Sequence, residues 1–209
     1  MIKQKTLLHW LGLLGVTAFI SYAVAVIFSP LAYPDYDWIR QAVSDLSADN
    51  APSRTLWVQL SSLYYPASIV GVMAVCIAVQ GKYTKLIRLG IYLFAIMGWV
   101  SAVGFAAFPL TEGGTGGGTL QDTMHMVVTG VVVILSLTSL LILTIGGLRQ
   151  KTFISLGVCA VVALFLMLIG PIGMAFPEYF GLFQRFSNMI SANGFGAVLG
   201  IMLFIGRFD

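Results

Sequence analysis

Six long apolar segments set the strongest limit on what this chain can fold into. They cover approximately residues 7–28, 56–79, 87–108, 123–148, 152–176 and 186–205. A helix of about 20 mainly apolar residues is long enough to cross a bilayer. In lipid, a helix satisfies its own backbone hydrogen bonds, which a single strand or loop does not. The segments therefore predict an all-α bundle of six transmembrane helices.

The composition agrees with a lipid environment. Hydrophobic residues make up 58% of the chain and charged residues only 9%, whereas about 25% of the residues in an average soluble domain are charged. The loops are too short for a second domain, so we expect one integral membrane domain over residues 1–209. Lys3 and Lys5 before the first segment resemble a signal peptide, but that segment reaches spanning length, and we expect an uncleaved first helix.

Basic residues are unevenly distributed between the loops. On an alternating six-span path, eight of the 11 fall on one side, at positions 3, 5, 82, 85, 88, 149, 151 and 207. Arg40, Arg54 and Arg185 fall on the other side. The positive-inside rule then predicts that both termini are cytoplasmic. The net charge of +3 is a topology signal on this interpretation, and no nucleic-acid partner is expected.

The first outer loop has the pattern of an amphipathic helix. Its apolar residues recur at helical spacing: Trp38, Ile39, Ala42, Val43 and Leu46. Asp35 follows a proline and is placed to cap such a helix. We expect a short interfacial helix on the outer membrane surface. It would hold Ser44 and Asp45 over the bundle.

The second outer loop leads to a histidine. Residues 113–118 are rich in glycine but lack the lysine of a phosphate-binding loop, and we expect a flexible connector or lid. The next segment begins with Asp122 and His125, which share one helical face because they are three residues apart. The carboxylate is thus placed to orient the imidazole.

No ionisable residue lies near the middle of any apolar segment, which disfavours an ion-driven transporter or a carboxylate-lined channel. Pro66 and Pro171 lie within segments and predict kinks. Two kinks at similar depth would open a cavity toward the outside. Ordinary packing irregularity is the alternative interpretation.

Several short motifs resemble a known family. They are residues 44–48 (SDLSA), the Phe108-Pro109 helix stop, His125, and residues 181–185 (GLFQR). Together they resemble DUF998, an uncharacterised family of bacterial and archaeal membrane proteins, over nearly the whole chain. The resemblance implies six or seven spans in a prokaryotic plasma membrane and no established activity. The residue before the arginine is often acidic in that family, whereas this chain has Gln184.

Three functional hypotheses follow. The first is a protein that binds a lipid-like or small amphiphilic ligand from the outer leaflet, with Arg185 and His125 recognising its anionic group. Asp122 and Asn188 are the other candidate ligand contacts. A purely structural role is another of the three hypotheses: these polar residues only tie the outer loops together.

The second hypothesis is a membrane-embedded hydrolase or transferase acting on a lipid headgroup or acyl ester. Ser44 or Ser47 would be the nucleophile, His125 the base and Asp45 or Asp122 its orienting partner. Arg185 would hold a phosphate or oxyanion. No nucleophile-elbow motif supports this hypothesis.

No metal or cofactor is expected. A zinc site of three histidines cannot form, because the chain has two histidines and they fall on opposite sides of the membrane. Cys76 and Cys159 lie in apolar segments and are interpreted as buried structural thiols. Small residues in the last segment, Gly194, Gly196 and Gly200, allow close helix packing either within the chain or between chains. The oligomeric state is therefore left open.

Overall fold

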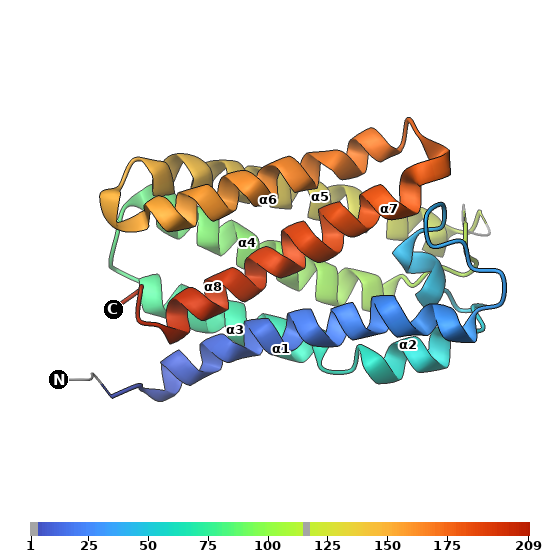
Figure 1. Cartoon of the computed structure of the whole chain (residues 1–209), viewed down its shortest axis with the longest axis horizontal. Helices are drawn as coiled ribbons and strands as arrows, with labels where there is room; N and C mark the ends of the chain where they lie inside the picture. Colours follow the sequence, from blue (N-terminus) through green and yellow to red (C-terminus); the bar gives the residue numbers. More distant parts are fainter. Residues whose placement is uncertain (1–3, 115–117) are drawn as a thin grey trace.

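The computed structural model describes residues 4–114 and 118–209, and it is helical without any strand in these ranges. Figure 1 shows the helices running side by side in one bundle. The longer elements, in chain order, are α1 (Leu7–Phe28), α2 (Arg54–Leu60), α3 (Tyr64–Val79), α4 (Lys85–Ala107), α5 (Leu120–Leu148), α6 (Ile154–Gly173), α7 (Phe180–Arg185), the π-helix η5 (Phe186–Asn193) and α8 (Gly194–Phe204). Short 3-10 turns lie between them: η1 (Ser29–Ala32), η2 (Val43–Ser47), η3 (Lys151–Phe153) and η4 (Pro177–Tyr179).

The predicted fold class is confirmed. Six helical stretches of the described chain are long and apolar enough to cross a membrane: Leu7–Ala32, Arg54–Val79, Lys85–Ala107, Leu120–Leu148, Lys151–Gly173 and Pro177–Phe204. The second stretch is interrupted, because α2 ends at Leu60 and α3 begins at Tyr64. Pro66 explains the break, since a proline ring clashes with the carbonyl four residues earlier and is tolerated only in the first turn of a helix.

The two ends of the bundle differ. Both termini lie at one end, called here the terminus end (Figure 1). The opposite end, called the loop end, carries residues 29–53, 109–114, 118–119 and 174–179. An even number of crossings places the termini on one side, as in the predicted path. The cytoplasmic position of the terminus end stays a prediction from the positive-inside rule.

Glycines bring the first and last helices into backbone contact. A Cβ added at Gly200 would overlap the carbonyl oxygen of Gly12, and one added at Gly15 would lie 2.8 Å from the carbonyl oxygen of Gly196. Gly194 has only ordinary contacts, 3.8 Å from the Met189 carbonyl oxygen. Gly196 and Gly200 therefore serve packing within the chain, of the small-residue type that membrane helices use.

The expected interfacial helix is wrong in its extent. Only Val43–Ser47 is helical, as the 3-10 turn η2, and residues 38–40 form a turn. The apolar side chains of Val43 and Leu46 are buried in the protein and do not lie on the membrane surface.

Tertiary hydrogen bonds explain this conformation. The Val43 amide donates to Gln184 Oε1 at 2.6 Å. The carbonyls of Ile39 and Arg40 accept from the amides of Leu182 and Gly181 at the start of α7. A regular helix over residues 38–46 would need these same backbone groups for its own ladder.

The contact between α1 and α8 can be tested with a pair of glycine substitutions. Gly200→Ala is expected to lower the free energy of unfolding by about 1–3 kcal/mol, because the new methyl forces two backbones apart. Gly130→Ala on α5 is the control, since a Cβ there meets nothing within 4 Å. Melting temperatures in detergent measure both. Equal melting temperatures for the two variants would contradict the close packing.

Candidate functional site

The loop end contains most of the buried ionic groups of the protein. Among the described residues, five Asp, Glu, His, Lys or Arg side chains are buried, and four of them lie at this end. Their exposed fractions are 1% for Asp45, 3% for Asp122, 7% for His125 and 2% for Arg185. These are the residues that the sequence singles out. The fifth, His9, lies at the terminus end.

Arg185 is the centre of this cluster. It is the last residue of α7, and its guanidinium points at the first outer loop. One terminal nitrogen, Nη1, donates to the carbonyls of Gln41 at 3.1 Å and Gly181 at 2.8 Å. The other, Nη2, donates to the Tyr36 hydroxyl at 2.8 Å. The guanidinium carbon lies 4.3 Å from the centre of the Trp38 ring, a cation–π contact.

The charge of Arg185 is incompletely matched. Its Nε is buried and has no hydrogen-bond partner in the described chain. The ion pairs of the described residues involve His9, Arg40 and Arg54 but not Arg185. Its partners are thus neutral carbonyls, a phenol and an aromatic face. Because taking a cation out of water costs several kcal/mol, this environment favours an additional anion.

Asp45 joins the first outer loop to the second. Its two carboxylate oxygens accept from the amides of Ala42 at 3.1 Å and Gly114 at 3.0 Å. Burial raises the pKa of the Asp45 carboxyl, although these two amides and the nearby charges of Arg185 and His125 act in the opposite direction. Asp45 therefore lies within electrostatic range of both Arg185 and His125.

Tyr36 links the guanidinium to the loop backbone. Its hydroxyl accepts from Arg185 and donates to the Ala42 carbonyl at 2.7 Å. Burial raises the pKa of Tyr36 to about 12, although the charge of Arg185 lowers it. The phenol is therefore neutral at physiological pH and adds no counter-charge to the site.

Asp122 serves the start of α5. Its oxygens accept four hydrogen bonds, from the amides and the hydroxyls of Thr111 and Thr119, at 2.7–3.1 Å. In return, the Thr119 hydroxyl accepts from the Asp122 amide at 3.1 Å. This is a capping box that also ties the second outer loop to the helix. The carboxylate has no hydrogen bond to His125.

His125 is oriented by a backbone group. Its Nδ1 lies 2.9 Å from the Phe108 carbonyl oxygen, so Nδ1 carries a proton, because a carbonyl only accepts. The ring also packs on Phe105, with 4.8 Å between ring centres. Its Nε2 has no hydrogen-bond partner among the described residues. The helix stop at Phe108 and the histidine therefore form one unit.

The other predicted site residues are less closely connected to this cluster. Neither Ser44 nor Ser47 is hydrogen-bonded to His125 in the described chain, and the Ser47 hydroxyl donates to the Ser44 carbonyl at 3.0 Å. Asn188 lies in η5, where its carbonyl and side-chain oxygens accept from Asn193 Nδ2 at 3.1 and 2.9 Å. Asp45 thus lies within electrostatic range of His125 and Arg185, whereas no side-chain hydrogen bond joins the two serines or Asn188 to these residues in the described chain.

The contacts around the guanidinium were not predicted from the sequence. Tyr36 and Gln41 hold it, Trp38 covers it, and Gln184 fastens the same loop to α7. One signal was available: arginine side chains pair with aromatic faces and with arrays of carbonyls, and residues 33–38 contain three aromatic residues. The described part of the glycine-rich loop has a definite role through Gly114, whereas residues 115–117 lie outside the described residues.

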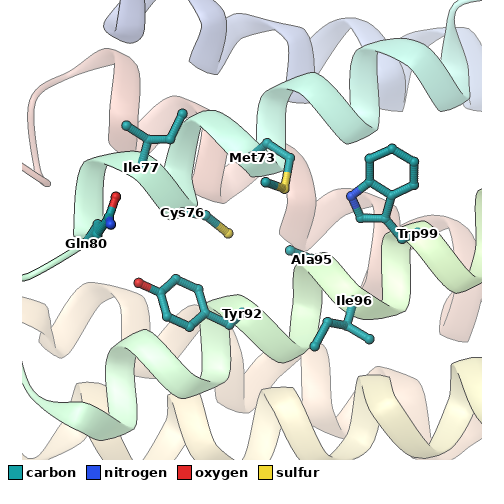
Figure 2. A pocket seen from close by; sticks show the side chains of 8 residues that line it. All are labelled: Met73, Cys76, Ile77, Gln80, Tyr92, Ala95, Ile96 and Trp99. Carbon is teal, nitrogen blue, oxygen red and sulfur yellow. The ribbon is translucent and has the colours of Figure 1, made fainter.

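Two hollows lie away from this cluster. One, of about 440 Å³, lies between α3 and α4 (Figure 2). The other, of about 340 Å³, is lined by α1 and by residues 59–63. Neither is lined by Pro66 or Pro171, so an outward cavity between kinked helices stays a prediction.

The described residues contain no group of three His, Cys, Asp or Glu side chains that could hold a metal ion. Cys76 is buried and Cys159 is partly exposed. The two thiols form no disulfide with each other.

Comparison with known proteins gives a family without a described activity. A family model with the description "Protein of unknown function (DUF998)" matches residues 16–200. No curated protein and no solved structure matches the chain. The site must therefore be interpreted from its own geometry.

The buried carboxyl of Asp45 predicts a specific pH dependence. An unfolded aspartate titrates near pH 4, and the pKa is higher in the folded protein. Between the unfolded pKa and the higher folded pKa, the folded state keeps the carboxyl proton that the unfolded state has lost. The free energy of unfolding therefore falls as the pH rises through this window, from about pH 4 to the folded pKa of Asp45. Asp45→Asn should remove that fall, as seen in melting temperatures across the window.

Asp35→Asn is the matched control. Asp35 is an exposed acid of the same loop with a φ of 59°, a conformation that asparagine tolerates. This variant should keep the decline of the wild type. A decline of equal size in Asp45→Asn would show that the buried carboxyl is not its source.

Proposed function

The chain belongs to the DUF998 family, and because that family has no described activity, we propose from its geometry that this integral membrane protein binds an anionic, lipid-like ligand at the loop end. Arg185 is the group that receives the anion. In the predicted orientation, the ligand comes from the outer leaflet of a prokaryotic plasma membrane.

A single observation carries the proposal: a buried guanidinium whose Nε has no hydrogen-bond partner, and which has no carboxylate ion pair, among the described residues. Guanidinium edges fit the two oxygens of a phosphate or carboxylate in a bidentate manner. An anion at Nε would complete the hydrogen bonding of the side chain and neutralise its charge in one step.

The neighbouring acid does not prevent anion binding. Asp45 would repel an anion when it is ionised, but burial raises the pKa of its carboxyl. An anion beside Arg185 would raise that pKa further, because a like charge disfavours ionisation. Binding of the ligand is then coupled to uptake of a proton by Asp45.

The surroundings of Arg185 suit an apolar tail. Trp38, Ile39, Tyr179 and Phe186 are all exposed large side chains from the segments next to it. Exposed apolar surface at the end of a membrane bundle faces the interfacial region, where an amphiphile places its head beside its tail. The ligand class is therefore an amphiphile with a phosphate or carboxylate head.

The hydrolase or transferase alternative has less support. It needs a nucleophile within hydrogen-bond reach of its base, and neither Ser44 nor Ser47 bonds to His125 in the described chain. Asp122 and Asn188 were also candidates for ligand contact. Their oxygens already accept from Thr111, Thr119 and Asn193, so Arg185 remains the principal ligand group in this proposal.

Native mass spectrometry with added dodecyl phosphate tests the proposal. The wild type in dodecyl maltoside is expected to retain one dodecyl phosphate, and Arg185→Gln is expected to retain none, because the charge and the fork of donors are gone. Arg185→Lys should bind more weakly, since it keeps the charge without the planar fork.

Tyr36→Phe is the structural control. It removes one hydrogen bond from the guanidinium and is expected to lower the free energy of unfolding by roughly 1 kcal/mol, with dodecyl phosphate still retained. If all four proteins retain the ligand equally, or none does, Arg185 only fastens the loops. The structural hypothesis would then replace the binding hypothesis.

A further inference from the structure

The groove between α3 and α4 lies away from the loop-end cluster and has a different character. Figure 2 shows its eight lining side chains on two neighbouring helices. They are Met73, Cys76 and Ile77 of α3, Gln80 directly after it, and Tyr92, Ala95, Ile96 and Trp99 of α4. Each set has the positions i, i+3, i+4 and i+7, so each helix presents one continuous face.

Small side chains make this surface concave. Cys76 and Ala95 are buried between the two helices, whereas Ile77, Ile96 and Trp99 are exposed beside them. The result is a hollow of about 440 Å³ with a low floor and high apolar walls. Along each helix the lining covers seven residue steps, or about 10 Å at 1.5 Å per residue. An extended hydrocarbon chain suits such a shape better than a bulky ring system.

The polarity of the groove changes along its length. The amide of Gln80 and the hydroxyl of Tyr92 lie together at one end in Figure 2, and Trp99 lies at the other. Gln80 follows the last residue of α3, so the polar end is the terminus end. The groove thus has the polarity of a lipid in that leaflet, with the head near the membrane surface and the tail inward.

Basic residues lie next to the polar end of the groove. Arg88 lies one helical turn before Tyr92 on the same face of α4, and its Nε is buried without a hydrogen-bond partner among the described residues. Lys82 and Lys85 are exposed in and beside the connection from α3 to α4. Lys82 donates to the Phe208 carbonyl at 3.2 Å. The nearby acid, Asp209, is paired with His9 at 2.9 Å.

We propose that this groove is a binding site for one acyl chain of an anionic phospholipid, whose phosphate contacts Arg88 and Lys85. The chain lies on Cys76 and Ala95 between the apolar walls. The site belongs to the leaflet at the terminus end, which is the cytoplasmic leaflet in the predicted orientation. It is independent of the loop-end ligand, because the two sites lie at opposite ends of the bundle.

A competition experiment tests the lipid class. The purified protein is given equal amounts of phosphatidylglycerol and phosphatidylcholine with the same acyl chains, and retained lipid is identified by native mass spectrometry. The wild type should prefer phosphatidylglycerol. Arg88→Gln should reduce that preference roughly fivefold, which corresponds to about 1 kcal/mol for one basic residue at a charged surface. Arg149→Gln, which removes an exposed arginine at the start of the next connection at the same end, should leave it unchanged.

The thiol in the floor reports occupancy of the groove directly. In a Cys159→Ser background, N-ethylmaleimide can label only Cys76, and phosphatidylglycerol should slow that labelling more than phosphatidylcholine does. Ala95→Phe, which fills the floor, should abolish lipid retention. The labelling of Cys76 is measured with Ala95 in place, so its result does not depend on whether Ala95→Phe folds. Labelling of Cys76 at the same rate with and without lipid, or equal lipid preference in Arg88→Gln and Arg149→Gln, would overturn the proposal.

Discussion

The guanidinium of Arg185 carries a full charge into the protein interior, and the loop end is arranged around it. Its donors hold the Gln41 carbonyl and the Tyr36 hydroxyl, and so the first outer loop lies across α7. Asp45, held in that loop, accepts from Gly114 and thereby fixes the start of the glycine-rich loop. Arg185 thus acts together with Gln184, which also fastens the first loop to α7, while Asp45 joins that loop to the second.

In that arrangement the charge and the hydrogen-bond donors of Arg185 are only partly satisfied, and for this reason we assign a ligand there. Neutral carbonyls and an aromatic face stabilise a cation only in part, and one guanidinium nitrogen has no hydrogen-bond partner in the part of the chain that the structure describes. A purely structural role would be served by an arginine with all five donors satisfied or paired with an acid. The acid present is Asp45, whose two carboxylate oxygens accept hydrogen bonds from backbone amides. It does not form an ion pair with Arg185.

Much of the fold is readable from the sequence because length and apolarity alone decide which segments can span a bilayer. The sequence also singled out Asp45, His125 and Arg185, since ionisable groups beside apolar segments are few; all three are buried, and their part in a functional site stays a prediction. The hydrogen-bond partners of the candidate site residues and of the first loop were not predicted from the sequence. Spacing placed Asp122 beside His125, but Thr111 and Thr119 take up its carboxylate. Helical periodicity from Trp38 failed because tertiary hydrogen bonds to Gln184 and α7 claim the loop backbone. Such contacts join distant segments and leave no local pattern.

The Nε of Arg185 can be observed directly by NMR, which makes it the sharpest test of the central claim. The protein would be labelled with ¹⁵N-arginine, and its Arg185 Nε–H signal identified by the loss of that signal in Arg185→Lys. Our account predicts that dodecyl phosphate shifts this signal while a matched amount of additional dodecyl maltoside does not. A signal that responds to neither amphiphile, or equally to both, would contradict a role for Arg185 as an anion receptor.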